Sequence, residues 1–505
     1  MKKRILSILL ALIMLTSMAA GCASDTDGGA DDAAQNQGGA DDTAAAEPEI
    51  PASDILEIPA DVNYEGDTIT YLVSTGTNWG NENIVVEELT GETINDSIYN
   101  RNIAVEEKLN IVLEQIDCKY DTMQNEVSNV VHAGTGDFDI VMPRLFYYAA
   151  LAQEGMLLNV DSLEHVNTDK VWWDDTIRRD LSVLGNLYAL VGDMHMYAND
   201  ATWIMLFSKD LYNDLGYNEI YGSVYDIVKD GKWTFDKFTE IMKDVTFDLD
   251  GDSTLTEKDQ IAHLAANNNP IFAFISAAGE SMYKKTETDI SLNIASDSFI
   301  TVVDQVIRIM NDDYMTLNTY STEKWGKKAA TLKGNNQMQK NMFGENRVLF
   351  RSEVLDVVDQ YSDLDLDFGI IPYPKYNESQ KDYVSIIIPD VVVTSVPVDC
   401  KESDKISVVL ETMASLSRDT VRTAYYDVTL QRKNARDEES SAMLDIIFSN
   451  RMYMFDMVFD WGGLKNKIIE SVNNAQNDMA TIAASLNTQI SNEISKTLEA
   501  FKSVN

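Results

Sequence analysis

The chain has few of the residues on which disulfide-built proteins and many enzymes depend. Its 505 residues include only 3 Cys, too few for a disulfide scaffold, and 4 His, which form no spaced cluster. No GxSxG, HExxH, GxGxxG or P-loop motif occurs. These absences argue against the commonest hydrolase, metalloprotease and nucleotide-binding classes. Two-carboxylate chemistry of the glycoside-hydrolase kind stays open, because an acidic chain easily supplies the pair.

Basic residues are also scarce. The chain has 40 Lys and Arg against 82 Asp and Glu, a formal net charge of -42. A surface this acidic repels phosphate backbones and anionic lipid headgroups. We therefore expect no nucleic-acid partner.

Long hydrophobic runs are limited to the amino terminus, which reads "MKKRILSILLALIMLTSMAAGC". A basic start is followed by an apolar run from Ile5 to Leu15, shorter than the roughly 20 residues that span a bilayer. This pattern predicts a signal peptide over residues 1–21. The small residues before Cys22 resemble a bacterial lipobox, although Ala19 departs from the commoner Leu, and the resemblance implies lipidation of Cys22. The alternative is an ordinary signal peptide that leaves Cys22 as a spare thiol.

Residues 22–62 are predicted to be the lipidated cysteine and an acidic, disordered tether. The stretch "ASDTDGGADDAAQNQGGADDTAAAEPEIP" contains no aromatic residue, Lys or Arg and cannot build a core. About forty such residues reach on the order of 35 Å. Cys118 and Cys400 remain, and the sequence does not decide whether they pair.

The remainder alternates predicted strands and helices, which indicates an α/β fold with parallel sheets. The segments "TITYLVS", "IVLEQI" and "DFDIVM" are predicted strands, separated by the helical patterns "INDSIYNRNIAVEEKLN" and "YDTMQNEVSNVVHA" and followed by a helical "FYYAALAQEG". Ligands of such sheets bind at the carboxyl ends of the strands. Four residues there are candidate ligand contacts: Trp79, Arg144, Phe146 and Tyr147.

The stretch "DLDGDSTLTEKD" places carboxylates at alternate positions around a glycine. On a twelve-residue calcium loop, Asp248, Asp250 and Asp252 fall at positions 1, 3 and 5, Thr254 at 7 and Asp259 at 12. Ser253 replaces the usual Gly at position 6, and the last ligand is Asp rather than Glu. The loop resembles a dockerin-type variant, and we expect it to bind structural Ca²⁺. The alternative is a solvated acidic loop.

Several segments, taken in order, resemble the extracellular solute-binding lipoproteins of bacterial ABC importers. The segments are "YNRNIAVEEKLN", "DFDIVM", "VWWDDTIRRDLSVLGNLYALVGD", "WIMLFSKDLYNDLG", "GKWTFDKF", "FGIIPYPKY" and the YY-x-x-x-L of "YYDVTLQRK". The resemblance implies a two-lobed periplasmic-binding-protein type II fold with an interlobe ligand cleft and hinge crossovers. The implied domains are a first lobe over 63–199 and 343–390, and a second lobe over 200–342, with the calcium loop at 248–259, and over 391–505.

Similarity to the maltose-binding branch implies crossings near Tyr197 to Trp203, Met342 to Phe350 and Ile386 to Thr394. It adds candidate ligand residues on the hinge, on a second-lobe loop and on a return strand: Tyr197, Asn199, Asn268, Asn269, Phe272, Arg351 and Glu353.

The expected function is capture of a carbohydrate, an oligosaccharide or related polar solute, and its delivery to the permease subunits without chemistry. We expect a monomer that is lipid-anchored to the outer face of the cell membrane. A calcium-dependent cell-surface interaction protein is the alternative, and a glycan-acting hydrolase is a third interpretation.

Overall fold

The computed structural model describes residues 51–77, 80, 82–253, 255–265, 267–312, 314–319, 335–361, 364, 366–426 and 438–502. The predicted signal peptide, Cys22, most of the tether, Trp79 and Thr254 lie outside the described residues.

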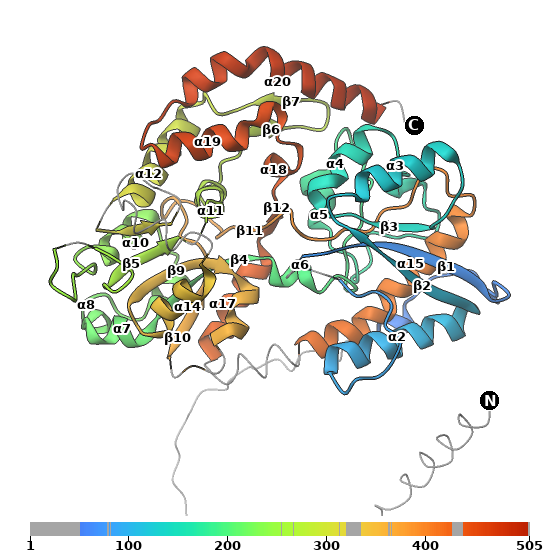
Figure 1. The fold of residues 1–505 in the computed structure, drawn as a ribbon, viewed down its shortest axis with the longest axis horizontal. Coiled ribbons are helices and arrows are strands. Elements are labelled where there is room, and N and C mark those ends of the chain that lie inside the picture. Colours follow the sequence, from blue (N-terminus) through green and yellow to red (C-terminus); the bar gives the residue numbers. More distant parts are fainter. Residues whose placement is uncertain are drawn as a thin grey trace, which may run out of the picture. The chain divides into compact units, whose positions relative to one another are not determined.

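The first lobe is built on a three-stranded sheet of order β2-β1-β3, in which both pairs of strands are parallel. The helices α2 and α15 pack side by side against it (Figure 1). Strands and helices alternate along this part of the chain, as the sequence predicts. The elements are η1 (Ala52–Asp54), β1 (Asp67–Thr75), α2 (Thr93–Leu109), β2 (Ile111–Lys119), α3 (Met123–Ala133), β3 (Ile140–Met142), α4 (Leu145–Gln153), η2 (Val160–Ser162), α5 (Thr176–Leu181), α15 (Ser403–Ser417) and the π-helix η4 (Arg418–Arg422).

The second lobe is built on a five-stranded mixed sheet of order β10-β4-β9-β5-β8. β5 runs parallel to β8 and β9, whereas β4 is antiparallel to both of its neighbours. Its elements up to β11 are β4 (Trp203–Ser208), α7 (Lys209–Asp214), α8 (Tyr217–Tyr221), α9 (Val224–Lys229), α10 (Phe235–Met242), β5 (Ile261–Ala265), α11 (Asn269–Ala277), β6 (Tyr283–Lys285), β7 (Ile290–Leu292), α12 (Asp297–Asn311), β8 (Thr316–Asn318), α14 (Asn336–Gly344), β9 (Val348–Val354), η3 (Leu355–Tyr361), β10 (Phe368–Ile371) and β11 (Ser385–Ile387).

Local sequence signals set several of these helix boundaries. Thr234 caps α10, its Oγ1 accepting a hydrogen bond from the Lys237 amide at 3.2 Å, the usual role of a threonine at this position. Asn110 ends α2 in the left-handed conformation that commonly closes a helix. Both signals lie within one turn of the helix that they bound, which is why sequence alone can identify them.

The chain passes between the lobes through α6 (Tyr197–Asp200), which leads into β4. It returns after β11, where Val392 and Ser395 form antiparallel bridges to Arg144 and Val141 at the edge of the first sheet. These two passages coincide with two of the predicted crossings. The chain enters the second lobe again before α17 (Glu438–Ser449), which packs on β10.

The predicted crossing near residues 342–350 is wrong. β9 pairs with β4 and β5, and β10 pairs with β4, so both strands belong to the second sheet and not to a return into the first lobe over 343–390. Likewise, α15 packs on α2 of the first lobe, although 391–505 was assigned to the second. A buried strand has the same apolar pattern in either sheet, so sequence alone does not show which sheet it joins.

The final helices pack against elements of both lobes. α19 packs on α12 of the second lobe, whereas α18 and α20 contact α4 of the first. These last elements are β12 (Arg451–Tyr453), α18 (Phe455–Phe459), η5 (Trp461–Gly463), α19 (Leu464–Asn473) and α20 (Met479–Lys502). In the described part of the chain, no helix has both the length and the apolar character needed to cross a membrane.

The two cysteines of the folded part do not pair. Cys118, at the end of β2, and Cys400, before α15, are both free thiols. Burial raises the pKa of each thiol above its ordinary value. Stability therefore comes from packing rather than from a disulfide.

Candidate functional site

The carboxyl ends of β1, β2 and β3 lie at one edge of the first sheet because the strands are parallel and in register, with Tyr71 of β1 opposite both Gln115 and Ile140. Tyr120 follows β2, and Phe146 and Tyr147 open α4 directly after β3. All three aromatic side chains are half-buried. The strand ends thus present partly accessible aromatic faces, the surface that sugar rings stack on.

Arg144 is buried at this edge of the sheet and connects neighbouring segments. Its side chain is only 1% exposed and lies 3.7 Å from the Asp390 carboxylate. Its guanidinium donates to the Asp390 carbonyl at 2.5 Å, to Thr77 Oγ1 at 2.6 Å and to the Gly80 carbonyl at 3.1 Å. Arg144 therefore ties the loop after β1 to the return segment at residue 390. It positions the site rather than offering its charge to a ligand.

A second-lobe cation reaches the aromatic edge. The ammonium of Lys465, on α19, lies 5.2 Å from the centroid of the Phe146 ring, within the range of a cation–π contact. Lys465 also acts on Asp390. Burial raises the pKa of the Asp390 carboxyl, and the positive charges of Arg144 and Lys465 partly offset that rise. Phe146, Asp390 and Lys465 therefore lie together, and they come from three separate parts of the chain.

A second carboxylate approaches from the end of β9. Burial raises the pKa of Asp356, and the charges of Asp359 and Glu353 raise it further. Burial raises the pKa of the Tyr197 hydroxyl well above its ordinary value, and the negative charges of Asp356 and Asp390 raise it further. The element η3, which carries Asp356, packs on α6, so this acid of the second lobe lies near the hinge tyrosine. We call Tyr120, Phe146, Tyr147, Asp356, Asp390 and Lys465 the strand-end set.

Tyr197 also explains a glycine. Gly80 has a positive φ of 68°, and a Cβ there would lie 2.6 Å from the Tyr197 ring, so only glycine fits. The Tyr197 amide donates to the buried Glu82 carboxylate at 2.8 Å. The start of α6 is therefore packed directly against the loop after β1. Asn199, two residues on, accepts from Arg451 at 2.6 Å and is turned to a different surface.

The predicted second-lobe residues divide into accessible and buried positions. Asn268, half-buried, accepts a hydrogen bond from the Asn473 side chain at 3.1 Å, and its neighbour Asn269 is also half-buried. Phe272 is only 1% exposed and lies in the hydrophobic core. The prediction that Phe272 contacts a ligand is therefore corrected, because an apolar ring on α11 packs inward.

Arg351 is also a core residue. Its side chain is 2% exposed, pairs with Glu353 at 3.0 Å and bonds to the Tyr361 hydroxyl. Its charge is thus satisfied within the second lobe, and Arg351 orients Glu353. Glu353 is 14% exposed and accompanies Asp356 at the end of β9.

Sequence reasoning missed Tyr120, Asp356, Asp390 and Lys465. Tyr120 was detectable, because it follows a predicted strand as Phe146 does. No local sequence pattern identifies Lys465 as a site residue, because it reaches the site from α19, far along the chain. The acids were hidden among the chain's 82 acidic residues.

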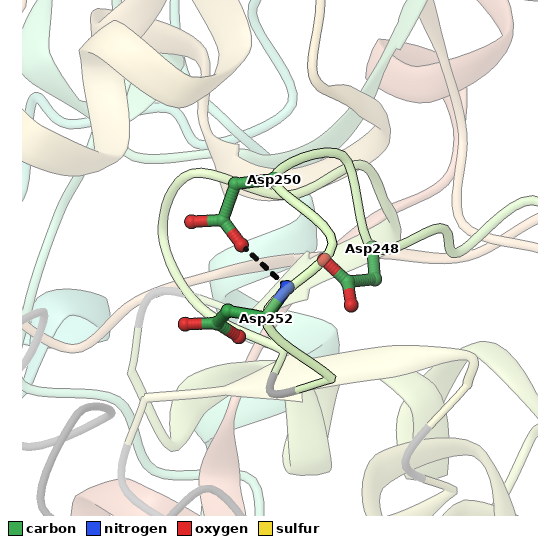
Figure 2. A group of neighbouring side chains, drawn as sticks. All are labelled: Asp248, Asp250 and Asp252. Carbon is green, nitrogen blue, oxygen red and sulfur yellow. Dashed lines mark hydrogen bonds between the residues drawn. The ribbon is translucent and has the colours of Figure 1, made fainter.

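The acidic loop brings its first three carboxylates together. Carboxylate oxygens of Asp248, Asp250 and Asp252 all lie within 4.8 Å of one another (Figure 2). Asp248 accepts from the Gly251 and Ser253 amides, both at 2.7 Å, which bends the loop around it. Hard oxygen ligands at such spacing fit Ca²⁺.

Asp259, the predicted last ligand, is not part of that group of three. It is fully buried and accepts from the Leu249 amide at 3.0 Å and the Thr256 amide at 2.5 Å. It holds the two ends of the loop together.

Two buried histidines are used in structure. His195 bonds to Gly192 and to Thr394, and burial lowers its pKa to about 4. His263 lies between Thr316 and Ser352, and burial lowers its pKa to about 3. Both imidazoles are neutral at pH 7 and bridge neighbouring segments.

The sequence matches no family model and no curated protein. Its structure is similar to solved structures along most of its length. A cyclo/maltodextrin-binding protein complexed with maltotetraose is 14% identical, with a TM-score of 0.52 over 87% of this chain and 97% of that chain. UspC of M. tuberculosis is 13% identical, with a TM-score of 0.51 over 86% of this chain and 100% of that chain.

The maltose-binding periplasmic protein MalE of Listeria monocytogenes, in complex with maltose, is 12% identical, with a TM-score of 0.50 over 86% of this chain and 98% of that chain. Identities this low show the fold alone. The sheets, the passages between them and these similarities agree with the fold class predicted from the sequence. The chain therefore has the two-lobed α/β fold of the periplasmic binding proteins.

Proposed function

We propose that the protein is the substrate-binding component of an ABC importer and captures a carbohydrate at the strand-end set. The observation that carries the proposal is the position of Phe146, an accessible aromatic ring that has Lys465 of the second lobe 5.2 Å from its centroid. Aromatic faces cover the apolar face of a sugar ring, while charged and amide side chains satisfy its hydroxyls. The sugar ligands named for two of the similar structures support the same ligand class.

Each residue of the set has a role in this proposal. Phe146, Tyr147 and Tyr120 stack on the sugar. Asp356 and Asp390 accept hydrogen bonds from its hydroxyl groups, and Lys465 donates to a hydroxyl or ring oxygen. Arg144 ties Asp390 to the loop after β1, so that less conformational entropy is lost when Asp390 binds the sugar.

Capture requires no bond to form or break. The ligand enters between the lobes, which rotate about the passages at α6 and residue 390, and the closed form presents a different surface to the permease. Hinge closure around a ligand is the established behaviour of periplasmic binding proteins. Because the ligand contacts both lobes only in the closed form, its binding energy shifts the population toward closure.

The amino-terminal pattern supports an anchored location. We propose that Cys22 is diacylated and that the acidic tether holds the folded part just outside the cell membrane. The acidic loop is proposed to hold a structural Ca²⁺ through Asp248, Asp250 and Asp252. The ion would offset the repulsion of the three carboxylates and stiffen the loop, without changing which sugar the protein binds.

The test is isothermal titration calorimetry of the wild-type chain, Phe146→Ala and Tyr314→Ala against glucose, maltose and maltotetraose. Tyr314 is 69% exposed and is not part of the strand-end set, so it serves as an aromatic control. Phe146→Ala should weaken binding by about 1–3 kcal/mol, and Tyr314→Ala should leave it unchanged. Recovery of a cleaved sugar would overturn the proposal in favour of a hydrolase. Absence of binding across a broad solute panel would favour the calcium-dependent interaction protein.

A further inference from the structure

The structure contains a cavity that no residue of the strand-end set lines. It has a volume of 630 Å³, within the range of about 300–1,000 Å³ typical of small-molecule sites. Of the predicted ligand residues that the structure describes, only Asn199 lines it. We call this cavity the crossing pocket. Its lining includes Trp173, Asp174, Asp193, Arg422, Phe448 and Arg451.

The crossing pocket is built where the chain passes between the lobes. Ala198 and Asn199 belong to α6, the first passage. Arg451 opens β12, which pairs with β11 immediately before the second passage. Tyr425 and Tyr426 precede residues 427–437, and α17 follows them. Residues of α6, β12 and α17, together with Tyr425 and Tyr426, therefore form part of the wall close to these passages.

The buried charged residues that line the crossing pocket form ion pairs with one another or with neighbouring residues. Arg451 lies 3.5 Å from Asp174, which also accepts from the Tyr453 hydroxyl at 3.0 Å. Asp193 lies 3.0 Å from Arg418 and 3.5 Å from Arg422. A charged ligand would have to compete with one of these pairs, whereas a neutral hydroxyl can accept from the arginine and donate to the carboxylate.

Two further observations favour a hydroxyl-rich ligand. The Nε of Arg451 is buried and has no hydrogen-bond partner within the described residues, and a buried donor without a partner is costly. The guanidinium of Arg422 lies 4.7 Å from the Tyr426 ring centroid, and that of Arg451 lies 5.1 Å from the Phe448 ring centroid. Both rings are half-buried, so aromatic surface and planar donors occur together. The exposed acids Asp175 and Asp445 disfavour an anion.

We propose that the crossing pocket is a second binding site for a neutral, hydroxyl-rich solute of about one or two sugar rings, and that its occupancy changes the equilibrium between lobe arrangements. The wall joins Asp174 of the first lobe to Ser441 and Asp445 of α17, which packs on β10 of the second lobe. Rotation of the lobes therefore alters the pocket, and a solute there binds the two arrangements with different affinity. Coupling between the two sites is then reciprocal. The coupling rests on the proposed function, whereas binding in the pocket does not.

The experiment uses Phe146→Ala as background, so that the strand-end set is weakened. Calorimetry is run with glucose, galactose, mannose, maltose, cellobiose and lactose, with glucosamine and glucuronate as charged comparisons. We expect at least one neutral sugar to bind. Adding Phe448→Ala should weaken that binding about tenfold or more, as should Ser441→Trp, which fills the pocket from α17. Adding Tyr314→Ala should leave it unchanged.

Three results would overturn the second site: no neutral sugar binds in the Phe146→Ala background, binding there is insensitive to both pocket substitutions, or only a charged sugar binds in the pocket. Failure of the proposed function looks different, because Phe146→Ala would then change no binding event of the wild-type chain. The coupling is tested separately with Ser441→Trp alone, which should shift the affinity of the strand-end set, and an unchanged affinity would refute it.

Discussion

Replacement of Arg144 by Met tests the claim that this buried cation positions the strand-end set. Arg144 is 1% exposed and makes hydrogen bonds to Asp390, Thr77 and Gly80, besides its ion pair with Asp390. Breaking a fully buried pair costs about 3–5 kcal/mol. Because Asp390 keeps 28% exposure and water can hydrate it, we expect a loss of about 2–4 kcal/mol in the free energy of unfolding.

The loss should depend on pH through Asp390. The pKa of this carboxyl is already raised by burial, and the charge of Arg144 holds it down, so its pKa rises further in Arg144→Met. A carboxyl with a raised folded-state pKa contributes most stability below its unfolded value of about 3.9, and that contribution is lost as pH rises through the folded value. The deficit of Arg144→Met should therefore be larger at pH 8 than at pH 4.

The assay is urea unfolding followed by tryptophan fluorescence at both pH values. Arg178→Met is the matched control, because Arg178 is 34% exposed and pairs with Asp161 at the surface; it should cost less than about 1 kcal/mol. In a double variant, Asp390→Asn should recover part of the loss at pH 8. Stability of Arg144→Met within about 0.5 kcal/mol of wild type, the range of an ordinary surface substitution, would refute the reasoning.

Three further predictions concern other parts of the molecule. Calcium at about 100 times its dissociation constant should add about 2.7 kcal/mol of stability by mass action, and Asp250→Ala should abolish that gain while sugar affinity stays the same; a thermal shift in wild type equal to that in the variant would count against the site. Mass spectrometry of the mature amino terminus should show a diacylglyceryl cysteine at Cys22, and Cys22→Ala should release the chain from membranes; a free terminus elsewhere would exclude the anchor. Burial raises the pKa of Glu82 to about 7, so its stabilising contribution is present below pH 4.5 and lost as pH rises through 7. Glu82→Gln should therefore gain about 1–3 kcal/mol of unfolding free energy relative to wild type between pH 5 and pH 8. Parallel curves of unfolding free energy against pH for the two proteins would contradict the raised pKa.

Local patterns allowed the part of the first lobe from β1 to α4 to be predicted. β1, β2, β3 and the helices between them each carry their own periodicity, so each can be recognised from a short stretch of sequence. Phe146 and Tyr147 followed from one further rule, that ligands bind at the carboxyl ends of parallel strands. These predictions depend only on residues close together in the chain.

The remainder depends on contacts between distant residues. Arg144 was expected to contact a ligand, but its guanidinium donates to Asp390, 246 positions away, and to Thr77 and Gly80. β9 was assigned to the first lobe because its apolar sequence is compatible with either sheet. Lys465 and Asp356 join the site only after α19 and η3 have packed. Such contacts follow from tertiary structure and leave no local pattern.

The measurement that tests the central claim most directly is calorimetric titration of the wild-type chain and Phe146→Ala with maltose and maltotetraose, followed by analysis of the recovered sugar. The account predicts binding by the wild-type chain, weakening by about 1–3 kcal/mol in Phe146→Ala, and recovery of the sugar intact. Equal affinity of the two proteins for every sugar that binds, or recovery of the sugar cleaved, would contradict it.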